Sequence, residues 1–158
     1  DLPPSASTDY PRFANDDFDL DIVYVRPTQE GVIVLPLGEE TVTPLCVPKL
    51  ASLIRRPEDL LRHALIDSDN KKVRWPDWFA LNGMTAMAPH GMRFDRSFLA
   101  ISAAVNGLGI ALESTRLAER EIQAGQLVPI LAGRAVDVHY VGHFLVFPRL
   151  ALRRQRPV

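Results

Sequence analysis

Three consecutive polar residues, Asp95, Arg96 and Ser97, are the first candidates in this sequence for binding a small ligand. The stretch GMRFD that leads into them has the composition of a strand end, and the apolar residues after them recur at helical spacing. The Asp95 carboxylate accepts hydrogen bonds from an ammonium or amide group, whereas unpaired N–H groups at a helix start favour a carboxylate. A zwitterion suits both. The alternative is that Asp95 or Ser97 only caps the helix, and the two roles can coexist.

Arg26 is a second candidate, because it stands at the carboxyl end of the run LDIVYV. This run has the β-branched and aromatic composition of a strand. A guanidinium group pairs bidentately with a carboxylate, so Arg26 could anchor an acidic ligand. The alternative is an arginine that is simply solvated at a strand end.

Histidine spacing and nucleophile motifs do not favour a metal site or an enzyme. His139 and His143 are four residues apart, a spacing that places two ligands on one face of a helix, but the sequence around them predicts a strand. There is no G-x-S-x-G nucleophile elbow, Walker loop or dinucleotide fingerprint, and the glycine cluster NGLGIA ends a helix where a dinucleotide loop begins one. We therefore expect no catalysis, no cofactor and no metal.

The segment over residues 91–131 alternates strands and helices. A helix is expected over SFLAISAAVNG, ended by Gly107 and Gly109, and the wholly apolar appearance of GIALES then predicts a strand covered on both faces. A helix at 115–124 and a strand at 127–131 repeat the order. This order favours parallel strands joined by right-handed crossovers, with ligands beyond the carboxyl ends of the strands. The polar triplet described above occupies such a position.

The rest of the chain supplies further strands and helices. Three prolines in and beside the run at 41–48 suit an edge strand or one that passes between sheets, so this run is interpreted as a crossover between two subdomains. Trp75, Trp78 and Phe79 give one short helix an aromatic face, which we expect to pack on a core. The expected elements are a helical turn at 10–19, a central strand at 20–25, strands at 32–37 and 41–47, a helix from 57, a strand near 65, a helix at 75–83 and a long strand at 139–149.

Length and composition are those of an ordinary globular chain. The 158 residues are 47% hydrophobic and 23% charged, and a net charge of −1 gives no general attraction to nucleic acid or anionic membranes. The single cysteine, Cys46, excludes an internal disulfide and is expected to be buried in the apolar run TPLCVPKL. No apolar run approaches the about 18 residues of a membrane helix, and the first residues lack the features of a signal peptide, so we expect a cytoplasmic location.

Six stretches, in order, resemble the effector-binding domain of LysR-type transcriptional regulators. They are FANDDFDLDIVYV, LPLGEETVTPLCVPKL, PEDLLRHALID, FDRSFLAISAAVNGLGIAL, LAEREIQAGQLVPIL and HFLVFPR. The resemblance extends over about residues 10–149. The segments WPDWF and FDRS are similar to those of the branch that includes regulators of glycine cleavage, D-serine use and β-lactamase induction.

The resemblance implies an α/β fold that is two-lobed and type 2 periplasmic-binding-protein-like, with two crossover hinge strands and a small effector in the cleft. Residues 1–44 with 144–158 are expected to form regulatory subdomain I, which is incomplete here. Residues 45–143 are expected to form regulatory subdomain II.

The resemblance also implies site residues and partners. By motif matching, Asp95 and Ser97 fall at effector-contacting positions, and His143 falls at the first of two aromatic positions on the return strand, which faces the cleft. The expected effector is amino-acid-like or peptide-like, with Arg26 or the helix-start amides as its carboxylate partner. The intact protein is implied to form a homodimer or homotetramer and to bind DNA through an N-terminal winged helix-turn-helix that these residues do not include. The alternative function is that of a solute-binding protein of a transporter.

Overall fold

The described secondary structure is that of an α/β protein, as expected from the sequence. The computed structural model describes residues 20–69, 71–85 and 91–149. Fourteen helices and strands are assigned within these ranges. The helical turn expected at 10–19 and the tail after residue 149 lie outside the described residues.

The chain divides into two compact units. Unit 1 comprises Asp1–Glu39 and Tyr140–Val158, and unit 2 comprises Glu40–His139. The chain therefore passes between the units at two points, after Glu39 and after His139. The regulatory subdomains expected from the sequence, with limits after residues 44 and 143, stay a prediction.

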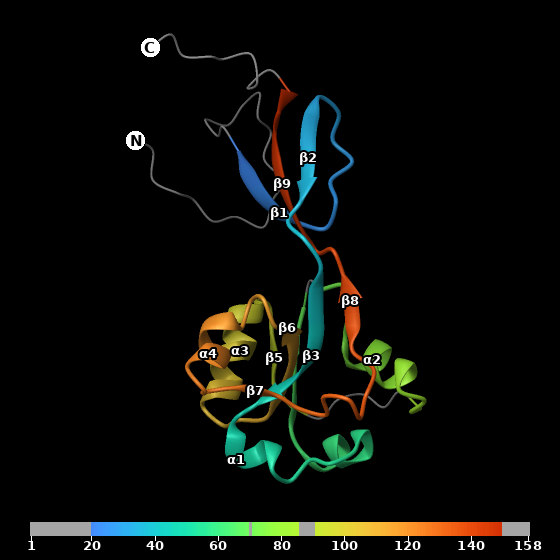
Figure 1. Cartoon of the computed structure of the whole chain (residues 1–158), viewed down its shortest axis with the longest axis vertical. Coiled ribbons are helices and arrows are strands. Elements are labelled where there is room, and N and C mark those ends of the chain that lie inside the picture. Colours follow the sequence, from blue (N-terminus) through green and yellow to red (C-terminus); the bar gives the residue numbers. More distant parts are fainter. Residues whose placement is uncertain (1–19, 70, 86–90, 150–158) are drawn as a thin grey trace. The chain divides into compact units, whose positions relative to one another are not determined.

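Unit 1 contains a three-stranded antiparallel sheet in the order β1-β9-β2 (Figure 1). The strands are β1 (Asp21–Tyr24), β2 (Val32–Pro36) and β9 (His143–Pro148). In this sheet β9 pairs with both neighbours, so the expectation that the run LDIVYV forms a central strand is wrong for the described residues. An apolar run indicates that both faces of a strand are covered. It does not indicate which strand lies in the middle of the sheet.

Unit 2 contains a mixed six-stranded sheet. Its path is β5-β4-β6-β3-β7, and β8 pairs with β3. The strands are β3 (Glu40–Cys46), β4 (Leu65–Ser68), β5 (Arg93–Phe94), β6 (Ile110–Ser114), β7 (Val128–Pro129) and β8 (Val138–Tyr140). Strand β4 pairs in parallel with β5 and β6, as the alternation of elements predicts. The antiparallel strand β3 lies between β6 and β7.

Of the two alternatives given for the prolines near 41–48, an edge strand does not apply to Pro44. It lies inside β3, opposite Leu112 of β6, and its carbonyl accepts a 3.0 Å hydrogen bond from the Ile130 amide. Because proline has no N–H, the strand lacks one hydrogen-bond donor at this position, but the Pro44 carbonyl still accepts a hydrogen bond. Pro48, in contrast, begins a short helix that was not predicted from the sequence, and it lies in the first turn, where proline is favoured.

Five helices accompany the sheet of unit 2, and Figure 1 shows α3 and α4 on one side of it and α2 on the other. Helix α3 packs Ala100, Ile101 and Ala104 onto the sheet residues Ile66 and Ala111. The helices are α1 (Pro48–Ala51), the 3-10 helix η1 (Pro57–Arg62), α2 (Trp75–Leu81), α3 (Ser97–Val105) and α4 (Glu119–Gln123). Trp75, Trp78 and Phe79 of α2 are fully buried, which confirms the expected packing of this aromatic face.

Two expected elements are shorter or divided. The helix expected at 115–124 is reduced to α4, because the Ser114 hydroxyl accepts a 3.2 Å hydrogen bond from the Arg116 amide and so forms a turn that competes with a helix start. The long strand expected at 139–149 is divided into β8 and β9 around Val141 and Gly142, because β8 pairs within unit 2 and β9 within unit 1.

Candidate functional site

The polar triplet lies at a strand-to-helix junction, as the sequence predicts. Strand β5 ends at Phe94 and α3 begins at Ser97, with Arg96 as the N-cap residue in extended backbone. No side chain of the described ranges caps this helix with a hydrogen bond. The Asp95 side chain is 71% exposed, and its nearest charged neighbour is Arg96, whose Nε lies 3.8 Å from Asp95 Oδ2. Neither Asp95 nor Ser97 is therefore committed to a helix cap in this structure.

The first turn of α3 presents unused donors. The amides of Leu99 and Ala100 both approach the Arg96 carbonyl, at 3.2 and 3.3 Å. The amides of Ser97 and Phe98 have no hydrogen-bond partner among the described residues. Unpaired amides at a helix start carry a partial positive charge and accept an anionic or carbonyl oxygen.

The other carboxylates beside this junction are neutralised by arginines. Arg93 Nε lies 2.6 Å from Asp69 Oδ1, and the Arg74 guanidinium donates to the Asp67 carboxylate. The hydrogen bond that Arg74 donates to Asp67 raises the pKa of Arg74. The contact of Asp95 with Arg96 is longer, at 3.8 Å, and the Asp95 side chain is 71% exposed, compared with 7% for Asp67 and 38% for Asp69. Asp95 is therefore the most accessible of these three carboxylates to a cationic group.

A buried polar cluster joins the ends of β4 and β6. Ser68 Oγ donates a 2.7 Å hydrogen bond to Glu113 Oε1, and Lys71 Nζ lies 3.3 Å from the same oxygen. Lys71 also donates to the Leu112 carbonyl. Burial lowers the pKa of Lys71, and the Glu113 carboxylate opposes that shift. The buried Thr43 lies opposite Glu113 in the strand pair, and its hydroxyl has no hydrogen-bond partner in the described part of the chain.

The sequence patterns do not predict this cluster. The wholly apolar appearance of GIALES is misleading, because the polar residues Glu113 and Ser114 are both buried in β6. A second buried contact ties β3 to β6, since Ser114 Oγ donates a 2.7 Å hydrogen bond to Glu40 Oε2. The available signal was the glutamate itself, because a charged residue inside a covered strand requires a buried partner.

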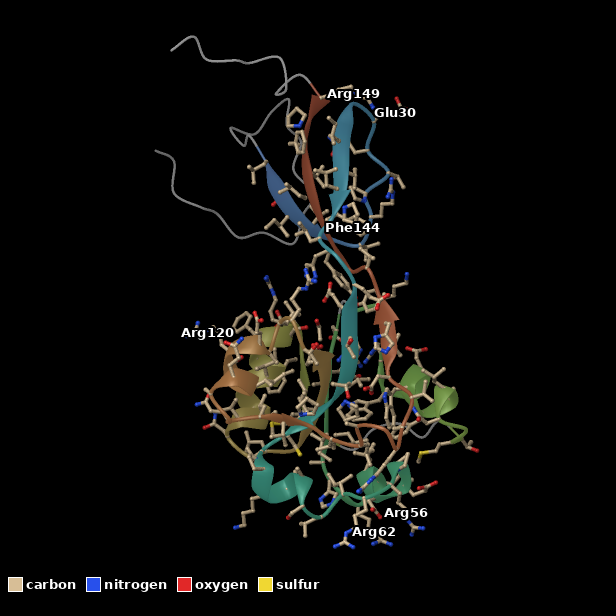
Figure 2. All side chains as sticks on the ribbon, in the orientation of Figure 1. Glu30, Arg56, Arg62, Arg120, Phe144 and Arg149 are labelled. Carbon is tan, nitrogen blue, oxygen red and sulfur yellow. The ribbon has the colours of Figure 1, made fainter. Side chains whose placement is uncertain are left out.

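In unit 1 the two candidates lie at neighbouring strand ends. Arg26 is exposed and follows Val25, which has a left-handed backbone (φ 69°) and donates its amide to the Gly142 carbonyl at 2.8 Å. The Arg26 guanidinium lies 6.0 Å from the ring centre of Phe144, a residue labelled in Figure 2. His143 begins β9, directly opposite Tyr24, with the two ring centres 5.3 Å apart.

The structure thus brings Asp95 and Ser97 together in unit 2, and it brings Arg26 and His143 to adjacent strand ends in unit 1. Within the described ranges, no group of three or more His, Cys, Asp or Glu side chains is arranged to hold a metal ion. Cys46 is fully buried, and burial raises the pKa of its thiol to about 12. Its thiolate is therefore suppressed at neutral pH.

Comparison with known proteins assigns this chain to a family. The profile of the LysR substrate binding domain matches residues 7–156. The chain belongs to the LysR family. The HTH-type transcriptional regulator PerR of Escherichia coli K12 is 52% identical over 149 residues, which cover 94% of this chain and 50% of PerR. The glycine cleavage system transcriptional activator of Escherichia coli K12 is 33% identical over 117 residues, covering 72% of this chain and 38% of the activator.

The solved structures agree with the family assignment. The effector domain of the transcriptional regulator AmpR of Pseudomonas aeruginosa superposes with a TM-score of 0.78 at 27% identity, covering 97% of this chain and 77% of that chain. The fold is therefore that of LysR effector-binding domains, and these relatives are transcriptional regulators rather than enzymes. The chain spans about half the length of the curated relatives it matches. No helix in the described part is long and apolar enough to cross a membrane.

Proposed function

We propose that this chain is the effector-sensing part of a LysR-type transcriptional regulator and that it binds a small amino-acid-like or peptide-like effector. Asp95 and Ser97 of unit 2 form one part of the binding site, and Arg26 and His143 of unit 1 form the other, so that the effector is held between the lobes. The family membership supports the sensing role. The observation that carries the site is the exposed Asp95 carboxylate beside the uncapped start of α3.

The chemistry of the junction favours a zwitterion. The Asp95 carboxylate accepts hydrogen bonds from an ammonium group, while the amides of Ser97 and Phe98 donate to a carboxylate. Because the neighbouring Asp69 and Asp67 are already paired with arginines, they add little repulsion toward the carboxylate of the ligand. Arg26 supplies a further partner for an acidic group from the other unit.

Binding across two lobes explains how a small molecule acts on a regulator. A ligand shifts an equilibrium between conformations only by its difference in affinity for them, and each tenfold shift requires about 1.4 kcal/mol. One charged hydrogen bond made in a single conformation contributes roughly 1.5 to 3 kcal/mol. A single contact from Asp95 or Arg26 is therefore enough to shift the population about tenfold or more.

The remaining parts of the proposal concern the intact protein. We place it in the cytoplasm and assign DNA binding to an N-terminal winged helix-turn-helix outside these 158 residues. The similarity to PerR, an HTH-type transcriptional regulator, supports the DNA-binding part. We also propose a homodimer or homotetramer. Exposed apolar side chains on and beside α3 support self-association. Phe98 is 65% exposed, Leu99 is exposed on the same helix, and the exposed Leu108 lies just beyond the end of the helix. The alternative, a transport protein, is not favoured, since the matched relatives are regulators.

A thermal-shift screen of the intact regulator tests the proposed effector class. The panel contains L- and D-amino acids and dipeptides, with their N-acetylated and C-amidated forms as matched controls. A ligand at about 100 times its Kd stabilises the folded protein by about 2.7 kcal/mol, which is a measurable shift in Tm. We expect stabilisation by compounds with both a free ammonium and a free carboxylate, and loss of it when either is blocked. Stabilisation that survives both modifications contradicts the zwitterion.

A further inference from the structure

Two carboxylates occupy neighbouring positions where β4 and β5 end. In this parallel pair Ser68 lies opposite Phe94. The Asp69 amide donates a 2.8 Å hydrogen bond to the Phe94 carbonyl, so the same register continues for one more residue. Asp69 is therefore the neighbour of Asp95 across the strand pair, at the usual strand spacing of about 5 Å.

The side chains of Asp69 and Asp95 share one side of this strand pair. Arg93 lies on the same side as Asp69, because its Nε is 2.6 Å from Asp69 Oδ1. Phe94 points to the other side, where it packs against the core that contains α3. Since side chains alternate along a strand, Asp95 follows on the side of Arg93.

Arg93 neutralises one of these two carboxylates. The side chains of Asp69 and Asp95 are 38% and 71% exposed, so both are open to a ligand. Arg74 does not replace Arg93 as the partner of Asp69, because it lies 3.8 Å from the same oxygen and donates to Asp67 instead. With Arg93 in place, the junction presents one weakly paired carboxylate, that of Asp95, rather than two.

The number of unneutralised carboxylates decides which ligand charges are favoured. One carboxylate beside the unpaired amides at the start of α3 matches a ligand with one positive and one negative group. Two carboxylates attract an ammonium more strongly and repel the carboxylate of the ligand. We propose that Arg93 is a specificity-determining residue of the Asp95 site. By neutralising Asp69, it favours zwitterions over ligands that carry an ammonium alone.

This assignment rests on the proposed function and deepens it. Calorimetric titration of the intact regulator tests it with two probes, the free-acid and C-amidated forms of the amino acid or dipeptide that gives the largest thermal shift in the screen described above. The quantity compared between variants is the ratio of Kd for the amide to Kd for the acid. We expect Arg93→Gln to lower this ratio about fivefold or more at low ionic strength, because the freed Asp69 carboxylate attracts the ammonium of the amide and opposes the carboxylate of the acid.

Three further variants separate the charge of Arg93 from a structural role. Arg93→Lys keeps the positive charge and should keep the ratio near that of the wild type. The double variant Arg93→Gln with Asp69→Asn removes both charges and should return the ratio to the wild-type value, which a loss of structure would not do. Arg62→Gln removes an exposed arginine of η1, which precedes the other end of β4 and is labelled in Figure 2, and should leave the ratio unchanged.

The outcomes distinguish this assignment from the proposed function. If the wild type prefers the acid and Arg93→Gln has the same ratio, the assignment is overturned and the proposed function stands. A ratio that falls equally in Arg93→Gln and in the double variant also overturns the assignment, because Asp69 then plays no part. If the wild type binds neither probe, or binds both equally, the proposed function fails and the assignment fails with it.

Discussion

Ser68 and Lys71 converge on one carboxylate oxygen, Glu113 Oε1, at 2.7 and 3.3 Å, and all three residues lie inside unit 2 near the ends of β4 and β6. Removing one member of a buried ion pair leaves the other charge without compensation and costs roughly 3 to 5 kcal/mol. We expect Glu113→Ala to lower the free energy of unfolding in urea by this amount. The double variant Glu113→Leu with Lys71→Met should recover most of the loss, and a loss below about 1 kcal/mol for Glu113→Ala contradicts the account.

The buried Cys46 thiol should make the free energy of unfolding depend on pH above pH 9. Its thiol pKa is raised from 9.0 to about 12 in the folded protein, so folding favours the protonated thiol. The resulting stability is fully present below pH 9 and is lost as the pH rises from 9 toward 12. The difference in unfolding free energy between the wild type and Cys46→Val should therefore fall by about 1 kcal/mol between pH 9 and pH 10. A constant difference over this range contradicts the burial of the thiol.

Gly109 allows β6 to approach β4 closely. A Cβ atom at this position would lie 2.4 Å from the Ala64 carbonyl oxygen, which accepts a 2.9 Å hydrogen bond from the Ile110 amide. Gly107 has a left-handed backbone but open space around it. We expect Gly109→Ala to cost about 2 kcal/mol or more in unfolding free energy and Gly107→Ala about 1 kcal/mol. Equal costs would show that the close approach is not required.

The exposed end of α3 should contribute to self-association. Phe98 is 65% exposed on this helix, and a lysine at its position introduces a charge into an apolar contact. In sedimentation equilibrium, we expect Phe98→Lys to weaken the proposed dimer of the intact regulator about tenfold or more. Leu53→Lys, at an equally exposed leucine elsewhere in unit 2, should leave the dimer unchanged. An unchanged dimer in both variants places the contact elsewhere.

The sequence was informative where local rules decide the structure. The strand-to-helix junction at Asp95–Ser97 and the end of α3 at Gly107 follow from composition and helical spacing. The LysR resemblance predicted the fold class, which the family match confirms. The aromatic face of α2 is buried as expected, because Trp75, Trp78 and Phe79 are too large and apolar to remain in water.

The sequence patterns did not predict contacts between residues that are far apart in the chain. The pairing of Ser68 with Glu113 joins residues 45 apart in the chain, and that of Glu40 with Ser114 joins residues 74 apart. No local period encodes either contact. The position of β9 in the middle of its sheet and the antiparallel direction of β3 likewise depend on pairing between distant segments.

Isothermal titration calorimetry of the intact regulator tests the central claim most directly. The titrant is the amino acid or dipeptide that gives the largest thermal shift. We expect Asp95→Asn to raise Kd about tenfold or more, because a charged hydrogen bond to the effector is lost. Ser97→Ala should raise Kd by a smaller factor, because it removes the hydroxyl and keeps the backbone amide. The matched controls are Glu119→Gln, an exposed carboxylate on α4, and Ser102→Ala, an exposed serine on α3, and both should bind as the wild type does. If Asp95→Asn and Ser97→Ala fold normally and bind with unchanged Kd, the effector site does not lie at the start of α3.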